Sequence, residues 1–389
     1  MRALLEESFR AAVAAADPLQ ILAPHLPAPP RGRVFVAAAG KAAASMALAV
    51  ENNYSFEVKG IAITRYGHGL PTRRIRVVEA GHPVPDEAGE AAAREILQKT
   101  KELEEEDLLL VLLSGGGSSL LSLPAPGVSM ADLKRLTGQL LRSGAPIQEM
   151  NTVRKHLSAI HGGRLAAACR APVLALIISD VTGDDPTHIA SGPCAPDPTT
   201  IEDAKAVLAK YRIEYLGPFS ESPKSVRATN KVIATAYRSL QAAAEVFRKN
   251  GIRPEILGDT MTGEAREVGR EMAQLARRTR GPAALISGGE CTVTLQEESG
   301  RGGRCCEFLL SLGIETGGIW AIAADTDGID GSEDNAGAIL SPDSLRRGPD
   351  AKAMLARHDS YGFFSALGDL VITGPTRTNV NDYRAVLIA

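Results

Sequence analysis

The chain has 389 residues, of which 43 are basic and 46 acidic, giving a net charge of −3. A single hydrophobic core stops growing at roughly 250–300 residues, so this length predicts two domains. The nearly balanced charge excludes the strongly basic surface of a typical nucleic-acid-binding protein. We therefore expect a small-molecule partner, bound in a cleft between the two domains.

Cysteine spacing and the N-terminal segment indicate the compartment. The five cysteines form no CxxC pair and no Cys/His cluster with zinc spacing, which fits a reducing environment. The first ten residues combine acidic side chains with helical apolar spacing, unlike a secretory signal. No apolar run approaches the ~20 residues that span a bilayer. We expect a cytoplasmic protein with no membrane or nucleic-acid partner.

Short apolar runs alternate with longer segments of helical period, which predicts an α/β fold with a mainly parallel sheet. Turn-forming residues concentrate at 215–223, so we expect domains at 1–222 and 223–389. The predicted strands are 34–39, 60–64, 75–80, 107–113, 172–179, 283–287, 319–324 and 383–388. The predicted helices are 2–16, 41–51, 86–103, 130–142, 147–160, 200–210, 224–249 and 262–279.

Two predicted strands end in glycine-rich polar loops. The run 108–113 leads into Ser114-Gly115-Gly116-Gly117-Ser118-Ser119, and the run 283–286 leads into a Ser-Gly-Gly-Glu segment that ends at Glu290. Glycine has no Cβ, so backbone N–H groups can close on an anion. We expect the loop 114–119 to bind phosphate. Ser118 or Ser119 as a covalent nucleophile is the weaker alternative, because the chain lacks a GxSxG elbow.

A lysine and two aspartates follow other predicted strands. Lys41 comes directly after the strand 34–39, and ligands of open α/β sheets bind at the carboxyl ends of strands. No P-loop pattern is present, and a solvated helix-start lysine is the alternative. Asp180 and Asp184 follow the strand 172–179, where carboxylates can hold Mg²⁺ or act as a general base. Turn or capping roles are the alternative for both.

Three segments of the second half carry further candidates. The segment GRGGR at 300–304 sets two guanidiniums among glycines, and the planar fork of Arg304 matches carboxylate and phosphate oxygens. The segment at 325–331 fails the calcium-loop test, because its fifth position is Ile329. A carboxylate-lined turn at Asp325 remains, and a dense hydroxyl and amide segment surrounds Asn379. We expect Glu290, Asp325 and Asn379 to contact substrate or phosphate.

Taken together in this order, the motifs resemble those of class II glycerate kinases, the two-domain family whose C-terminal part is known as the MOFRL domain. The resemblance rests on Gly40-Lys41, SGGGSS at 114–119, NTVRKHLS at 151–158, SDVTGDDP at 179–186, IASGPCAPDPTT at 189–200, SGGE at 287–290, GRGGR at 300–304, DTDGIDG at 325–331 and TGPTRTNVND at 373–382.

The resemblance implies ATP-dependent phosphorylation of D-glycerate with Mg²⁺, leaning towards 2-phosphoglycerate. It implies a Rossmann-like N-terminal domain, a smaller C-terminal α/β domain and a site between them, with Lys41 and Arg304 in the active site. Two departures are visible: His161 stands where a lysine is expected before Gly-Gly, and Cys305-Cys306 replace an expected Asn-Gln. We expect no role for the two cysteines in the mechanism.

These residues give a mechanistic hypothesis. The loop 114–119 cradles phosphate, and Lys41 neutralises charge on the transferred group. Arg304 pairs with the glycerate carboxylate or with phosphate, and Asp180 or Asp184 orients Mg²⁺ or accepts the hydroxyl proton.

Two alternatives stay open. A hydroxypyruvate reductase is one, although no GxGxxG turn with an acidic residue ~20 positions later is present. A non-catalytic sensor of sugar acids or nucleotides is the other. The sequence does not decide whether the protein forms a homodimer.

Overall fold

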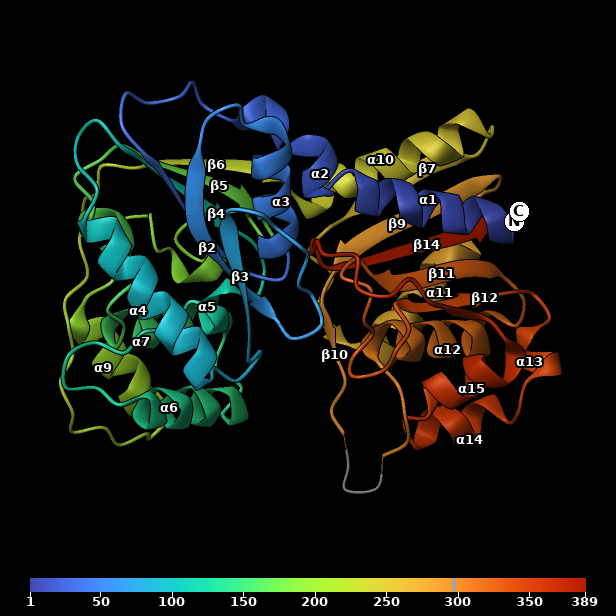
Figure 1. The fold of residues 1–389 in the computed structure, drawn as a ribbon. Coiled ribbons are helices and arrows are strands. Elements are labelled where there is room, and N and C mark those ends of the chain that lie inside the picture. The colour runs from blue at the N-terminus through green and yellow to red at the C-terminus, as the bar shows by residue number, and fades with distance from the viewer. Residues whose placement is uncertain (296–298) are drawn as a thin grey trace. The chain divides into compact units, whose positions relative to one another are not determined.

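The structure, a computed structural model, describes residues 1–295 and 299–389. The chain divides into two compact units, one of residues 18–233 and one that combines 1–17 with 234–389. We call them the parallel-sheet unit and the mixed-sheet unit (Figure 1). Both units contain strands and helices, so the predicted α/β class is confirmed. No described helix combines the length and the apolar character needed to cross a bilayer.

The parallel-sheet unit is built on a six-stranded sheet in the order β3-β2-β1-β4-β5-β6. The pairs β3-β2, β2-β1, β1-β4 and β4-β5 are all parallel. This strand order is that of the Rossmann-like dinucleotide-binding folds, as predicted. The strands are β1 (Val34–Ala39), β2 (Val58–Arg65), β3 (Ile75–Ala80), β4 (Leu108–Leu113), β5 (Val173–Ile178) and β6 (Thr229–Ala234).

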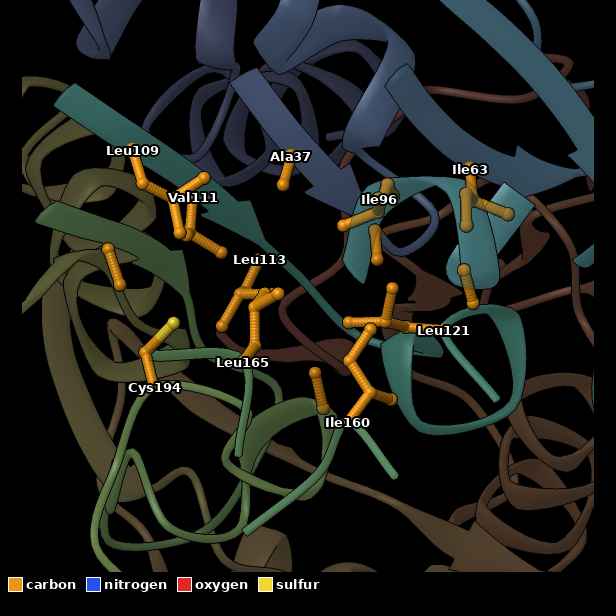
Figure 2. Close-up of a cluster of buried hydrophobic side chains, with 14 of the residues drawn as sticks. Ala37, Ile63, Ile96, Leu109, Val111, Leu113, Leu121, Ile160, Leu165 and Cys194 are labelled. Carbon is orange, nitrogen blue, oxygen red and sulfur yellow. The ribbon is translucent and has the colours of Figure 1, made fainter. Parts of the chain in front are cut away.

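The central strands of this sheet are apolar on both faces. All six residues of β1 and all six of β4 are buried, as expected for a parallel sheet with helices on its faces. Alternate residues such as Ala37, Val111 and Leu113 contribute to one cluster, to which Ile96 of α4 adds its side chain (Figure 2). The helices of the unit are α2 (Pro18–Ile21), η1 (Ala23–His25), α3 (Ala43–Asn53), α4 (Glu87–Lys101), α5 (Gly117–Leu120), α6 (Met130–Arg142), α7 (Ile147–His156), α8 (Arg164–Ala167), η2 (Ile189–Ser191) and α9 (Ile201–Lys210).

The mixed-sheet unit has a second six-stranded sheet in the order β13-β12-β11-β14-β9-β7, in which β14 runs antiparallel to both of its neighbours (Figure 1). A separate two-stranded sheet pairs β8 with β10. The strands are β7 (Arg253–Gly258), β8 (Gly263–Glu264), β9 (Ala283–Gly289), β10 (Cys291–Thr292), β11 (Trp320–Asp325), β12 (Gly337–Leu340), β13 (Leu370–Val371) and β14 (Asp382–Ile388).

Helices cover both faces of the mixed sheet. Ile322 and Ala385 pack with α1 and α10, whereas Ala321 and Val386 pack with α11 and α12, because successive strand residues point to opposite faces. The result is a three-layer unit. Its helices are α1 (Arg2–Ala14), α10 (Ala236–Lys249), α11 (Ala265–Arg278), α12 (Arg304–Thr316), α13 (Ser344–Arg347), α14 (Ala351–Ala356) and α15 (Ser360–Leu367).

The observed division differs from the predicted domains 1–222 and 223–389. The first helix belongs with the C-terminal half, because Leu5 and Phe9 of α1 bury their side chains against Leu240 and Phe247 of α10. The chain then passes between the units near residue 233. An amphipathic stripe on a helix does not show which later segment will cover it, so the packing of α1 against α10 could not be predicted from the pattern of α1 alone.

One predicted helix is partly wrong. The range 224–249 contains the strand β6, and helix α10 begins only after it. Thr235 marks the change, because its hydroxyl accepts a hydrogen bond from the backbone N–H of Arg238 at 3.3 Å and caps the helix. The alanine-rich sequence after position 235 favours a helix, and the predicted range wrongly included the residues of β6 that precede it.

Candidate active site

The carboxyl ends of three neighbouring strands lie together at one edge of the parallel sheet. Ala39 of β1 pairs with Leu113 of β4, and Leu113 pairs with Ile177 of β5. The chain order of the strands reverses direction between β1 and β4, and open α/β sheets bind ligands in the crevice at such a switch point. Lys41 follows β1, and residues 114–119, here called the glycine loop, follow β4.

Hydrogen bonds hold the two loops at the switch point together. The backbone N–H of Lys41 donates to the carbonyl of Gly115 at 2.8 Å, and the N–H of Ala42 donates to Oγ of Ser114 at 3.0 Å. Gly40 has φ +130°, and a Cβ there would collide with Ser114. The side chain of Ser114 is therefore buried in a structural contact.

Gly116 is the position where the glycine loop makes its closest side-chain contacts. It has φ +81°, and a Cβ there would lie 2.9 Å from the ring of His82 and 3.5 Å from Cγ of Lys41. The stem of Lys41 and the imidazole of His82 thus lie against this glycine. His82 is not among the residues predicted for the site, although it follows β3 just as Lys41 follows β1.

The glycine loop also contains unpaired amides. The N–H groups of Ser119 and Leu120 both donate to the carbonyl of Gly116. Within residues 1–295 and 299–389, the N–H groups of Gly115, Gly116 and Ser118 have no hydrogen-bond acceptor. Successive amides that lack a protein acceptor can bind an anion.

The two candidate metal-binding aspartates follow β5. Asp180 and Asp184 are half-buried, and Asp184 occupies a turn with φ +54° in which its N–H donates to the carbonyl of Val181 at 3.1 Å. No group of three or more His, Cys, Asp or Glu side chains arranged for a metal ion is found among the described residues. Two carboxylates are nevertheless enough for Mg²⁺, which commonly takes its other oxygens from water and phosphate.

Strand register explains a convergence of acidic residues in the mixed-sheet unit. Because β14 is antiparallel to β9 and β11, its first residue lies beside their last ones: Asp382 pairs with Gly289 and with Asp325. Glu290 follows directly after β9. Three carboxylates therefore meet at one edge of the mixed sheet.

Arg304, the first residue of α12, binds all three of these carboxylates. Its Nη1 lies 2.7 Å from Glu290, its Nη2 2.7 Å from Asp325, and its Nε 2.8 Å from Asp382. Burial opposes the charge, but the three carboxylates outweigh it and hold the pKa of Arg304 well above its usual value. We call these four residues the Arg304 group.

Because three carboxylates already bind Arg304, its expected role as a ligand-binding residue is restricted. The side chains of Asp325 and Asp382 are 3% and 0% exposed, whereas Glu290 is 56% exposed. A ligand anion would have to displace a carboxylate, and Glu290 is the one that solvent reaches. The other arginine of the GRGGR segment, Arg301, pairs with Glu333 and lies 4.2 Å above the ring of Tyr361.

The remaining candidate, Asn379, lies in a buried loop network. Its Oδ1 accepts the N–H of Asn381 at 3.3 Å. The same loop is tied to the end of β11, because Oγ1 of Thr326 donates to the carbonyl of Asn381 at 2.7 Å and accepts the N–H of Val380 at 2.9 Å. The structure thus brings Arg304, Glu290 and Asp325 into direct contact and ties the loop of Asn379 to the residue after Asp325.

The cysteines that depart from the motif are buried at the start of α12. The N–H groups of Cys305 and Cys306 each donate to the carboxylate of Asp330 at 2.9 Å. Burial raises the pKa of both thiols well above its usual value. Both pack in the core cluster of the mixed-sheet unit, and Sγ of Cys306 also accepts a hydrogen bond from Nδ2 of Asn335 at 3.3 Å.

Comparison with known proteins covers both units. Residues 4–231 match a family described as a domain of unknown function, DUF4147, and residues 283–382 match the MOFRL family. An Agrobacterium vitis protein that carries the provisional name hydroxypyruvate reductase is 50% identical, over 100% of this chain and 94% of that protein. A glycerate 2-kinase of Pyrococcus horikoshii is 40% identical, over 90% of this chain and 86% of the relative.

A solved structure agrees with these sequence matches. The crystal structure of a glycerate kinase from Thermotoga maritima superposes with a TM-score of 0.89 at 38% sequence identity. The superposition covers 100% of this chain and 99% of the other.

Proposed function

This chain belongs to the glycerate 2-kinase family with a MOFRL domain, and on that premise we propose that it transfers a phosphoryl group from ATP to D-glycerate. The observation that carries the proposal is the meeting of Lys41 and the glycine loop at the β1/β4 switch point. Phosphoryl transfer depends on positioning and on neutralising charge more than on covalent chemistry. An ammonium beside unpaired amides supplies both requirements.

Lys41 and the glycine loop have complementary roles in this proposal. The amides of Gly115, Gly116 and Ser118 receive phosphate oxygens, because they have no acceptor in the described chain. The ammonium of Lys41 neutralises charge on the transferred group, since its stem runs beside Gly116. The hydrogen bond from Lys41 to Gly115 keeps the two in register.

Asp180 and Asp184 would hold Mg²⁺. Their donor set of carboxylate oxygens suits this hard cation, and the two residues follow the strand next to the glycine loop. When bound, Mg²⁺ neutralises charge on the phosphates of the nucleotide. One of the two carboxylates would alternatively accept the proton of the reacting hydroxyl.

The Arg304 group has a narrower role than its sequence suggests. If a ligand anion displaces Glu290, one Nη of Arg304 becomes available, while Asp325 and Asp382 keep the guanidinium in place. Asp325 and Asn379 would act by shaping the loops that carry them.

The reductase alternative is not favoured. The name of the Agrobacterium protein is provisional, and this chain has no GxGxxG turn followed by an acidic residue ~20 positions later. A sensor would bind glycerate without consuming ATP.

One assay separates the three functions. We expect ADP to form only when D-glycerate is present, and to stop when EDTA removes Mg²⁺. Oxidation of NADH by hydroxypyruvate without ADP formation would establish the reductase instead. Binding of D-glycerate in calorimetry with neither reaction would establish the sensor.

A further inference from the structure

A second arginine lies beside the glycine loop. Nη1 of Arg154, on α7, lies 2.7 Å from Oδ1 of Asn151 and 3.4 Å from Oγ of Ser191. Oγ of Ser191 lies 2.8 Å from Oγ of Ser118 in the glycine loop. We call these four residues the Arg154 group. Hydroxyl contacts thus connect its guanidinium to the phosphate loop.

The charge of Arg154 has no protein counter-ion. In the described part of the chain Arg154 forms no ion pair, and its Nε and Nη2 donate to no acceptor. Burial lowers its pKa to about 10, with no carboxylate acting in the opposite direction. The neighbouring Lys155, in contrast, lies 3.3 Å from Asp197. A partly buried cation without a counter-ion is costly unless a ligand supplies the negative charge.

The surroundings of Arg154 do not supply that negative charge. His161 is buried, and neither of its ring nitrogens has a hydrogen-bond partner among the described residues. Burial, followed by the charges of Arg154, Arg164 and Lys155, lowers the pKa of His161 to about 3. The imidazole is therefore neutral at physiological pH. Nη1 and Nη2 of Arg164 donate to backbone carbonyls, so this second guanidinium is already used by the fold.

A strained turn orients the hydroxyl of the group. Ala190, Ser191 and Gly192 have φ of +50°, +56° and +58° in succession, and two of the three carry a side chain. Left-handed backbone is unfavourable for such residues and persists only where surrounding contacts impose it. Here the turn packs against Gly117, where a Cβ would lie 2.6 Å from that of Ala190. This packing holds Ser191 against Ser118.

We propose that Arg154, together with Asn151, Ser191 and Ser118, binds the carboxylate of D-glycerate. The proposal rests on the proposed kinase function and names where its substrate is recognised. The free Nε and Nη2 form the planar fork that matches two carboxylate oxygens. In a 2-hydroxy acid the carboxylate is attached to the carbon that bears the reacting hydroxyl. Its receptor must therefore adjoin the phosphate loop, and Ser118 belongs to both.

The test compares D-glycerate with glyceramide, in which a neutral amide replaces the carboxylate. We expect the wild type to prefer D-glycerate strongly. Arg154→Met should lower kcat/KM for D-glycerate about 10- to 100-fold. The same change should leave kcat/KM for glyceramide and KM for ATP nearly unchanged. Arg154→Lys keeps the positive charge and loses the planar fork, so its kcat/KM for D-glycerate should lie between those of the wild type and Arg154→Met.

A matched control uses Arg170, an exposed arginine of the same unit that lies 3.4 Å from Glu104. Arg170→Met should keep the full preference for D-glycerate. A general folding defect in Arg154→Met would lower kcat/KM for D-glycerate and for glyceramide by the same factor. If Arg154→Lys also lowered both values by the same factor, the proposal would be overturned.

Two further results are decisive. If Arg154→Met raised KM for ATP and kept the full preference for D-glycerate over glyceramide, Arg154 would bind a nucleotide phosphate instead of the glycerate carboxylate. That result would overturn the proposal. If the wild type forms no phosphoglycerate, the proposed kinase function is wrong, but the carboxylate site at Arg154 can still be tested by calorimetry. Binding of D-glycerate by wild type and not by Arg154→Met would support the carboxylate site, and equal binding would contradict it.

Discussion

Two arginines, one in each unit, follow opposite electrostatic rules. Arg304 is surrounded by the carboxylates of Glu290, Asp325 and Asp382. Arg154 has only neutral partners among the described residues. Each stands in a segment that resembles a family motif, and the motif does not distinguish them. The number of carboxylates around a guanidinium therefore indicates which arginine is a structural cross-link and which is open to a ligand.

Strand register and backbone strain produce this difference. At Arg304, the antiparallel β14 brings Asp382 beside the ends of β9 and β11, so carboxylates accumulate around one cation. At Arg154, a left-handed turn presents the hydroxyl of Ser191 instead of a carboxylate. The first arrangement favours stability, and the second favours binding.

The largest expected effect is the loss of stability in Arg304→Met. Removing the guanidinium takes a cation from the buried Asp325 and leaves the buried Asp382 with Arg384, 2.7 Å away, as its remaining ion-pair partner, which should cost about 3–5 kcal/mol of unfolding free energy. Arg154→Met should cost less than about 1 kcal/mol, because it breaks no ion pair. Urea denaturation of both variants measures this. Adding Asp325→Asn to Arg304→Met should restore part of the loss, and equal stability of the two single variants would contradict the contrast between the two arginines.

The next effect concerns catalysis in the parallel-sheet unit. Lys41→Ala should lower kcat by about 10²–10³-fold, since it removes one charged donor from the transferred phosphate. Its melting temperature should stay within a few degrees of the wild type, because Lys41 is half-buried. Lys59→Ala, at a lysine whose side chain is 80% exposed, is the control and should be fully active. Wild-type turnover in Lys41→Ala would remove this residue from the mechanism.

A smaller effect is expected in the glycine loop. Gly116→Ala combines a left-handed φ of +81° with crowding against His82, so we expect a stability loss of about 1–2 kcal/mol and roughly a tenfold rise in KM for ATP. Gly144→Ala is the matched control: its φ is +69°, with no atom within 4 Å of the new Cβ. It should lose similar stability and bind ATP normally. Equal KM values in the two variants would argue against phosphate binding by the loop.

The smallest effect is a pH dependence at a third arginine. Arg33, which is 65% exposed, donates to Asp107, and this hydrogen bond is the main cause that lowers the pKa of Asp107 to about 2. Because the pKa of Asp107 is lower in the folded state than its usual value of 3.8, the ionised carboxylate stabilises the folded protein at pH values above about 4. This contribution disappears as the pH falls from about 4 to 2. Because solvent screens the pair, we expect less than about 1 kcal/mol.

Asp107→Asn tests this dependence. The stability difference between wild type and variant, measured in urea, should shrink between pH 5 and pH 2. A difference that is constant over this range would show that the ion pair contributes no titrating stability.

Strand ends were the part of the site that sequence could predict. Buried apolar runs ending in glycine predict β1 and β4, and the parallel pairing of these two strands places Lys41 beside the glycine loop. The strand β6 was missed because its apolar run before Thr235 is short and covers only residues 232–234.

The environment of each arginine was beyond the reach of sequence. Arg304 binds the side chain of Asp382, which lies 78 positions later in the chain, and Arg154 contacts Ser191, which lies 37 positions later. Motif letters give the residue type and do not give its counter-ions, which depend on long-range packing. His82 required no such packing, since it follows β3 as Lys41 follows β1.

The most direct test of the central claim is ³¹P NMR of the protein incubated with D-glycerate, ATP and Mg²⁺. The measurement detects turnover and the position of the new ester together. We predict that 2-phosphoglycerate and ADP appear in equal amounts. A signal from 3-phosphoglycerate would contradict the adjacency of the carboxylate site and the reacting hydroxyl, and the absence of any new ester would contradict the kinase function itself.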